Sequence, residues 1–180
     1  ISSMRQQALA SQMDQHFTFN SLNSIQRFVA ENDTKSALRY ISRFGKLIRN
    51  MLNQARQNLV SLEEELQTLD LYLSLEQLRT KQGFEYRIEV DEEIQAELLE
   101  VPGGLMQPYV ENAIWHGLMP LEQAGLLEIL VKSRSSEEGL VITIRDNGIG
   151  RVAAAERKKK ERAQHKSHGI DITQERINTL

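Results

Sequence analysis

A histidine and two asparagines stand among aromatic residues near the start of the chain, in the stretch MDQHFTFNSLNSI (13–25). On a helix, His16 and Asn20 are four residues apart and share one face, so the Asn20 amide can bond one ring nitrogen and present the other. A neutral imidazole is a competent nucleophile near pH 7, since an unperturbed histidine has a pKa of about 6.5. The spacing favours a nucleophilic histidine or a core histidine satisfied by Asn20.

A second set of polar residues interrupts an apolar segment, QPYVENAIWHG (107–117). Glu111 and Asn112 are adjacent, and on a helix His116 lies one turn beyond Asn112. A buried polar side chain must be hydrogen-bonded or must hold a ligand. These residues could therefore cap neighbouring loops, or they could offer oxygen ligands to a divalent cation such as Mg²⁺, which bridges phosphates.

The segment DNGIG follows directly after a predicted strand and begins at Asp146. A carboxylate there can accept a hydrogen bond from an amino group such as that on adenine. Gly148 and Gly150 let the backbone approach a ligand and hinge a loop, although the same letters also describe a tight turn. A charged segment (151–167) and Gly169 come next. Together with the ENAIWHG segment, this pattern predicts a nucleotide site with a lid.

Helices must position the histidine. Apolar residues recur every three to five positions over residues 2–31 and again over 34–55, which predicts two amphipathic helices. Asn32 and Asp33 between them are turn and N-cap residues. Two such helices form an antiparallel hairpin that cannot bury both apolar stripes alone. A symmetric four-helix dimer is the simplest completion.

The later part of the chain mixes helices and strands. Ser61 and Glu64 form a capping box that opens a third helix, and a fourth helix is predicted over residues 103–118. Alternating apolar residues predict strands. We expect an α+β layer with antiparallel strands and helices on one face. The predicted strands are residues 84–90, 126–132 and 140–145.

Composition removes several classes of function. The chain has 180 residues, 40% of them hydrophobic and 26% charged, with a net charge of −3, so nothing favours a nucleic-acid partner. It contains no cysteine, which excludes disulfides and cysteine-ligated zinc. No apolar run approaches the roughly 20 residues that span a bilayer, and no signal peptide is visible. The chain starts within a helical pattern and without an initiator Met, so we expect it to be a fragment.

The motifs resemble those of known ATP-binding proteins. ENAIWHG, DNGIG and HGI (168–170) resemble the N, G1 and G2 boxes of the GHKL superfamily. HFTFNSLNSI resembles the phosphoacceptor motif of LytS-type sensor histidine kinases, whose usual form is P-H-F-L-F-N-x-L-N. The resemblance runs from about residue 8 to 180. Three further segments are similar to that family: VSLEEELQTLDLYLSLEQLR, VPGGLMQPYVENAIWHG and ITQERINTL.

The resemblance implies a role for each matching residue. His16 would be the phosphorylated histidine, with Asn20 orienting its ring. Asn112 would ligate Mg²⁺ on the phosphates of ATP, and Glu111 beside it would polarise or position the reacting groups. His116 would lie near the phosphates.

The glycine-rich segments receive roles in the same way. Asp146 would read the adenine amino group, while Gly148 and Gly150 would flank the adenine pocket and hinge the lid. Gly169 would let the backbone approach the phosphates. The chain departs from the family at Gln15, where the usual residue is Pro, and at Thr18, where it is Leu.

The resemblance also implies an architecture. Residues 1–58 would form the dimerisation and phosphotransfer hairpin, a four-helix bundle in the homodimer. Residues 59–180 would form a Bergerat-type α/β sandwich that binds ATP, with its last strands beyond Leu180.

The implied function is an ATP-dependent histidine kinase that passes phosphate to a response-regulator receiver domain. It would be a cytoplasmic part of a bacterial inner-membrane protein, attached to the membrane through an upstream region. The alternatives are a degenerate kinase that serves as an interaction module and a GHKL ATPase of another kind. ATP and Mg²⁺ are the expected cofactors.

Overall fold

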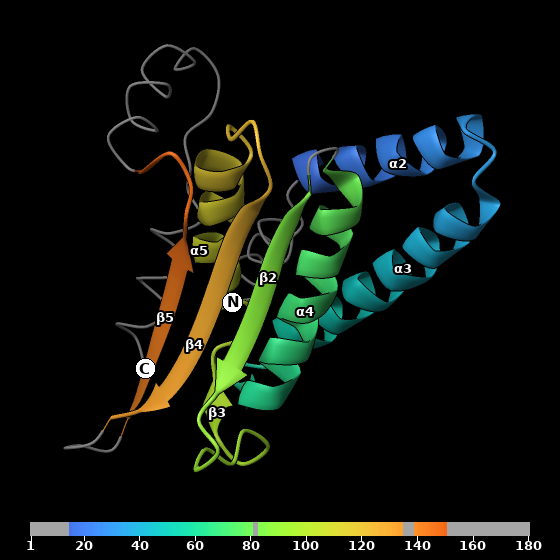
Figure 1. Cartoon of the computed structure of the whole chain (residues 1–180). Helices are drawn as coiled ribbons and strands as arrows, with labels where there is room; N and C mark the ends of the chain where they lie inside the picture. The colour runs from blue at the N-terminus through green and yellow to red at the C-terminus, as the bar shows by residue number, and fades with distance from the viewer. Residues whose placement is uncertain (1–14, 81–82, 135–138, 151–180) are drawn as a thin grey trace. The chain divides into compact units, whose positions relative to one another are not determined.

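The computed structural model describes residues 15–80, 83–134 and 139–150 (Figure 1). Side chains are described from Phe17 onward. These residues divide into two compact units. The first contains 15–79 and 99–105, and the second contains 80–98 and 106–150, apart from the gaps. Helix and sheet occur together, so the predicted α+β class is confirmed.

The first unit is built on the three helices α2 (Gln15–Ala30), α3 (Thr34–Arg56) and α4 (Leu62–Arg79). Asn32 turns the chain between α2 and α3 with a left-handed backbone (φ 55°), which Asn tolerates better than most residues. Asp33 caps α3 by accepting a hydrogen bond from the Ser36 amide at 3.0 Å. The predicted turn, cap and second helix are confirmed, whereas residues 2–14 of the first predicted helix lie outside the described residues.

Helix α4 begins at the predicted capping box. The Glu64 amide donates to Ser61 Oγ at 3.1 Å, and the Ser61 amide donates back to Glu64 Oε2 at 3.4 Å. Just before the helix, the short strand β1 (Val60–Ser61) pairs antiparallel with β3 (Glu100–Val101). This small sheet was not predicted, because two-residue strands carry too little pattern.

The core of the first unit lies where α2, α3 and α4 meet. The Phe17 ring lies 6.0 Å from the ring of Phe44 on α3 and 5.3 Å from that of Tyr72 on α4. Tyr40 and Leu47 of α3 are fully buried. Helix α4 therefore covers part of the apolar surface that α2 and α3 leave open.

The second unit contains a three-stranded sheet in the order β2 (Phe84–Val90), β4 (Gly125–Ser133) and β5 (Leu140–Asp146). Strand β4 is antiparallel to β5, as expected, but β2 is parallel to β4. The expectation of purely antiparallel strands is therefore wrong. The chain between β2 and β4 includes a helical crossover, and such connections join parallel strands.

The helix that precedes β4 differs from its prediction in two ways. It begins at Gln107 rather than 103, because Gly104 is left-handed (φ 71°) and Pro108 stands in the first turn. It also changes form along its length, from the α-helix α5 (Gln107–Asn112) to the π-helix η1 (Ala113–Leu118). The Met119 amide donates to the Ile114 carbonyl, five residues earlier, at 2.8 Å. This spacing is that of the wider π-helical turn.

Candidate functional site

The DNGIG turn packs directly on the end of the ENAIWHG helix. The Ile149 amide donates to the Gly117 carbonyl at 3.1 Å. A Cβ at Gly148 would lie 2.3 Å from the Gly117 carbonyl carbon, and a Cβ at Gly117 would lie 2.5 Å from Asp146 Oδ1. Two segments about thirty residues apart in the sequence therefore meet at Gly117, and a side chain at Gly148 would run into the backbone there.

The turn after β5 is held by its own polar side chains. Asp146 Oδ1 accepts a hydrogen bond from the Gly148 amide at 3.0 Å, which forms an Asx turn. Asn147 Oδ1 accepts from the Leu126 amide at 2.7 Å and ties the turn to β4. Gly150 has φ +81° with nothing within 4 Å of an added Cβ, so its backbone conformation is what favours glycine there.

The polar residues of α5 are anchored along the helix. Asn112 Nδ2 donates to the Pro108 carbonyl at 2.8 Å, so Asn112 Oδ1 points away from that carbonyl. Gln107 Nε2 donates to Glu111 Oε1 at 2.8 Å. Glu111, Asn112 and His116 are all half-buried. This side of the helix can offer one amide oxygen and one carboxylate to a ligand.

The donor set fits a magnesium ion held largely by a nucleotide. Mg²⁺ usually takes one or two protein oxygens and completes its shell with water and phosphate oxygens. In the described part of the chain, no three His, Asp or Glu side chains gather where they could hold a metal unaided. Asn112, with its amide nitrogen already bonded, would supply the protein oxygen.

The histidine segment belongs to the first unit. His16 lies on α2 one turn before Asn20, as predicted; its side chain lies outside the described ones. Asn20 is half-buried, and its backbone carbonyl accepts a hydrogen bond from Ser24 Oγ at 3.0 Å. Helix α2 therefore carries a further hydrogen-bonded polar side chain, Ser24, one turn after Asn20.

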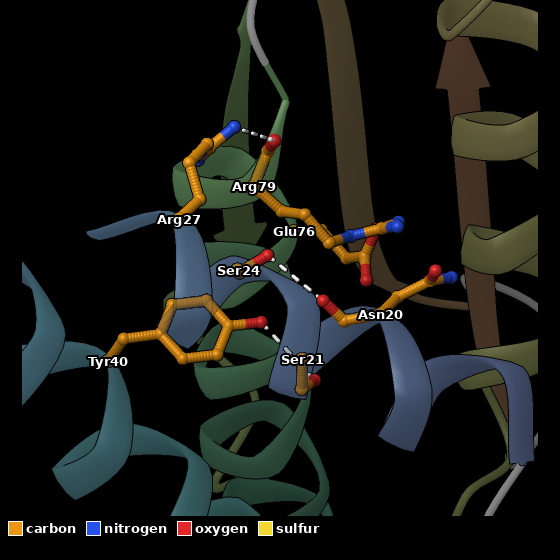
Figure 2. A network of polar contacts seen from close by, with 7 residues as sticks. All are labelled: Asn20, Ser21, Ser24, Arg27, Tyr40, Glu76 and Arg79. Atoms are coloured by element: carbon orange, nitrogen blue, oxygen red, sulfur yellow. Dashed lines mark hydrogen bonds and ion pairs between the residues drawn. The ribbon is translucent and has the colours of Figure 1, made fainter. Parts of the chain in front are cut away.

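A polar cluster joins α2, α3 and the end of α4 (Figure 2). Tyr40 of α3 donates to Ser21 Oγ at 3.2 Å, and burial raises the pKa of Tyr40. Glu76 is fully buried and forms an ion pair with Arg79. Burial raises the pKa of the Glu76 carboxyl, and the attraction of Arg79 opposes that rise.

Comparison with known proteins identifies the family. A histidine kinase family model matches residues 4–84. Sensor protein LytS of Staphylococcus saprophyticus is 36% identical over 143 residues, which are 79% of this chain and 23% of that protein. The chain belongs to the LytS-type sensor histidine kinases.

Other relatives agree with that assignment. Sensor protein LytS of Bacillus subtilis is 33% identical over 143 residues, which are 79% of this chain and 23% of that protein. Sensor histidine kinase YesM of the same species is 27% identical over 143 residues, again 79% of this chain and 24% of the relative. The chain therefore spans about a quarter of the curated relatives it matches. In the part of this kinase chain that the structure describes, no helix is long and apolar enough to cross a membrane.

The structure of this histidine kinase chain brings together some predicted site residues. Asp146 and Gly148 meet the ENAIWHG helix, whereas His16 and Asn20 belong to the other unit. Gly169 and the predicted lid (151–167) lie outside the described residues.

Two residues of the candidate site were missed. From the sequence alone, Gly117 is only the end of the ENAIWHG motif, and Asn147 is only part of a possible turn. The signal at Gly117 was its place at the end of a helix, where a second glycine-rich segment can approach closely.

Proposed function

We propose that this chain is the catalytic part of an ATP-dependent protein-histidine kinase of a two-component system. It phosphorylates its own His16 and passes the phosphate to an aspartate of a response-regulator receiver domain. The observation that carries the proposal is the closure of DNGIG onto the ENAIWHG helix at Gly117, in a chain that also places a histidine and an asparagine one turn apart on α2.

The nucleotide would bind beside Gly117. There Asp146, whose carboxylate is exposed, accepts a hydrogen bond from the adenine amino group. The packing of Gly148 on Gly117 brings the two motifs that would form the site into direct contact. Gly148 and Gly169 bracket the predicted lid (151–167), which lies outside the described residues.

The residues that would bind the phosphates of ATP differ from the histidine that would receive the phosphoryl group. Asn112 would hold Mg²⁺ through Oδ1, with Glu111 orienting the reacting groups and His116 near the phosphates. The ion, when bound, neutralises charge on the phosphates, which together with alignment is most of what phosphoryl transfer needs. Asn20 would hold one ring nitrogen of His16, and the other would attack the γ-phosphorus of ATP as its bond to ADP breaks.

The same proposal extends to assembly. Phe19 and Val29 of α2 and Leu38 of α3 are large apolar residues that are 66%, 62% and 63% exposed. A second copy that covers them would complete a four-helix bundle of two antiparallel hairpins. Residues 1–58 would serve dimerisation and phosphotransfer, and 59–180 would form the Bergerat-type ATP-binding domain. The parent protein would sit in the bacterial inner membrane with this part in the cytoplasm.

Incubation with γ-labelled ATP and Mg²⁺ tests the proposal. The chain should acquire acid-labile label, and His16→Gln should abolish the label while leaving nucleotide affinity unchanged, because His16 lies outside the ATP-binding unit. The matched control Gln26→Asn changes an exposed residue of the same helix outside the motif and should keep the label. If His16→Gln still acquires the label, another residue is the phosphoacceptor. The candidates are His116, His165 and His168. Free phosphate without protein label would indicate an ATPase, and neither product would indicate a degenerate interaction module.

A further inference from the structure

We propose that Asn147 is a positioning residue for adenine recognition, because its side chain fixes the turn that carries the Asp146 carboxylate to the amino group of the base. The inference rests on the proposed function, which gives Asp146 the adenine contact, and deepens it. It assigns the aim of that contact to a neighbouring side chain. Every residue on which it depends belongs to the second unit.

Asn147 continues the pairing of β4 and β5 by one residue. Strand β5 ends at Asp146, which lies opposite Leu127 on β4. Asn147 therefore lies opposite Leu126. In an antiparallel ladder, the two residues of a hydrogen-bonded pair exchange two backbone bonds. Here the Asn147 amide donates to the Leu126 carbonyl at 3.2 Å, but the Leu126 amide donates to Asn147 Oδ1, at 2.7 Å, in place of the backbone carbonyl.

The side-chain oxygen of Asn147 thus stands in for the backbone carbonyl of the same residue. Asparagine can do this because its side-chain amide resembles a peptide group, which is why it often replaces backbone bonds in turns. The Leu126 backbone keeps both of its hydrogen bonds to residue 147. The chain is meanwhile free to turn away from β4 directly after Asp146.

The start of β4 leaves room for this side chain. A Cβ added at Gly125 would lie 3.3 Å from Asn147 Oδ1 and 2.6 Å from Leu118 Cδ2. Gly125 is buried, so a larger residue there would press on both neighbours. The lack of a side chain at Gly125 therefore permits the close approach of Asn147 to β4.

Three successive amides of the turn, from residue 147 to residue 149, have three different acceptors. In order, these are the Leu126 carbonyl on β4 at 3.2 Å, Asp146 Oδ1 at 3.0 Å and the Gly117 carbonyl on η1 at 3.1 Å. The bond to Asp146 uses Oδ1 and leaves Oδ2 of an exposed carboxylate for the base.

The bonds of Asn147 lie where the chain leaves the sheet. Without Oδ1, a single backbone hydrogen bond would join residue 147 to β4, and the turn could rotate about it. Asp146 directly precedes this point, so its carboxylate would move with the turn. A displacement of about 1 Å is enough to weaken a directional contact strongly.

Nucleotide selectivity tests the inference. The full chain is titrated by calorimetry, in the presence of Mg²⁺, with ATP and with purine riboside triphosphate, which carries hydrogen in place of the 6-amino group. The wild type should prefer ATP by roughly tenfold or more, the usual value of a hydrogen bond to a charged group. Asn147→Ala should reduce this preference to about threefold or less, because the displaced carboxylate no longer meets the amino group.

Two further variants separate positioning from general damage to the turn. Asn147→Asp retains an oxygen acceptor in the same place and should keep the preference for ATP. Its added charge acts equally on both ligands, since they carry the same triphosphate. Asn147→Gln keeps the amide but places its oxygen one methylene further out, and should behave like Asn147→Ala. Loss of the preference in Asn147→Asp as well would overturn the proposal.

Amide hydrogen exchange tests the hydrogen bond without any nucleotide. The Leu126 amide should exchange about tenfold faster in Asn147→Ala than in the wild type, and at the wild-type rate in Asn147→Asp. Ile129, fully buried in the middle of β4, is the internal control and should not change. Unchanged exchange at Leu126 in Asn147→Ala would overturn the proposal.

Failure of the proposed function would give a different result. A wild type that binds ATP and the analogue equally would refute the adenine contact of Asp146, together with the role of Asn147 that depends on it. A wild-type preference that persists in Asn147→Ala and Asn147→Gln would refute the positioning role alone.

Discussion

Gly148 lies against Gly117 so closely that a Cβ at position 148 would be 2.3 Å from the carbonyl carbon of residue 117. Backbone cannot give way as the end of a flexible side chain can. The two segments that would form the nucleotide site are therefore joined by a contact that tolerates no side chain at residue 148, whereas a Cβ at residue 117 would meet the side chain of Asp146.

Gly148→Ala should separate the DNGIG turn from η1. We expect a loss of stability of about 1–3 kcal/mol, the usual range for overpacking, and at least a tenfold loss of ATP affinity by calorimetry. Gly45→Ala is the matched control, since an added Cβ at that helical position has nothing within 4 Å. It should raise stability by up to about 1 kcal/mol through helix propensity. Normal ATP affinity in Gly148→Ala would place the nucleotide away from this contact.

Asn112→Asp should impair the handling of Mg²⁺–ATP. The change adds a charge beside the phosphates and removes the amide that donates to the Pro108 carbonyl. We expect a stability loss of about 1 kcal/mol for the hydrogen bond and a much weaker dependence of nucleotide affinity on Mg²⁺. Asn53→Asp, at an exposed position of α3 in the first unit, adds the same charge outside the motif and serves as control. If both variants bind Mg²⁺–ATP like the wild type, Asn112 has no place in the site.

Glu76→Gln should change how stability depends on pH. The folded state raises the pKa of Glu76 above its ordinary value of 4.5, so it binds the proton more tightly than the unfolded chain does. Wild-type stability should therefore fall, relative to that of Glu76→Gln, as pH rises from 4.5 through the raised pKa. Urea unfolding at several pH values between 4 and 7 measures the difference. A difference between the wild type and Glu76→Gln that stays constant with pH would contradict the expected linkage.

The exposed apolar residues of α3 should mediate dimerisation. Leu38→Lys with Ile41→Lys changes two residues that are 63% and 46% exposed. If they are covered by a second copy, their replacement removes about 1.5–3 kcal/mol per side chain, and light scattering should report a monomer. Leu98→Lys, which is 73% exposed in the other unit, should leave the mass unchanged. A dimer that survives the double change must use another surface.

Local signals in the sequence predicted local structure well. The cap at Asp33 and the box at Ser61 and Glu64 were confirmed because each depends on residues within one turn. The parallel pairing of β2 was not predicted, since an alternating strand looks the same in either direction. The packing of α4 against Phe17 was missed for a similar reason, because it depends on partners more than fifty residues away.

In the candidate site, too, the residues could be predicted from local sequence, but the contact between distant segments could not. The residue types and spacing at Asn112, Asp146 and Gly148 pointed to the nucleotide site, and the structure brings the latter two to the helix end. The contact at Gly117 depends on how far η1 extends before β5 reaches it. The position of the end of η1 relative to β5 is set by the π-helical turn and by the pairing of the strands. The sequence pattern reveals neither of these.

The route of the chain through its two units has a consequence for gene exchange. Residues 99–105 return to the first unit between two stretches of the second, and β3 pairs there with β1. A recombination event that replaced everything after Arg79 would also replace half of this small sheet. An incoming segment would have to supply residues 100 and 101 that fit the resident Val60 and Ser61. Hybrid kinases that exchange this short segment together with the first unit should fold better than hybrids joined at a single point.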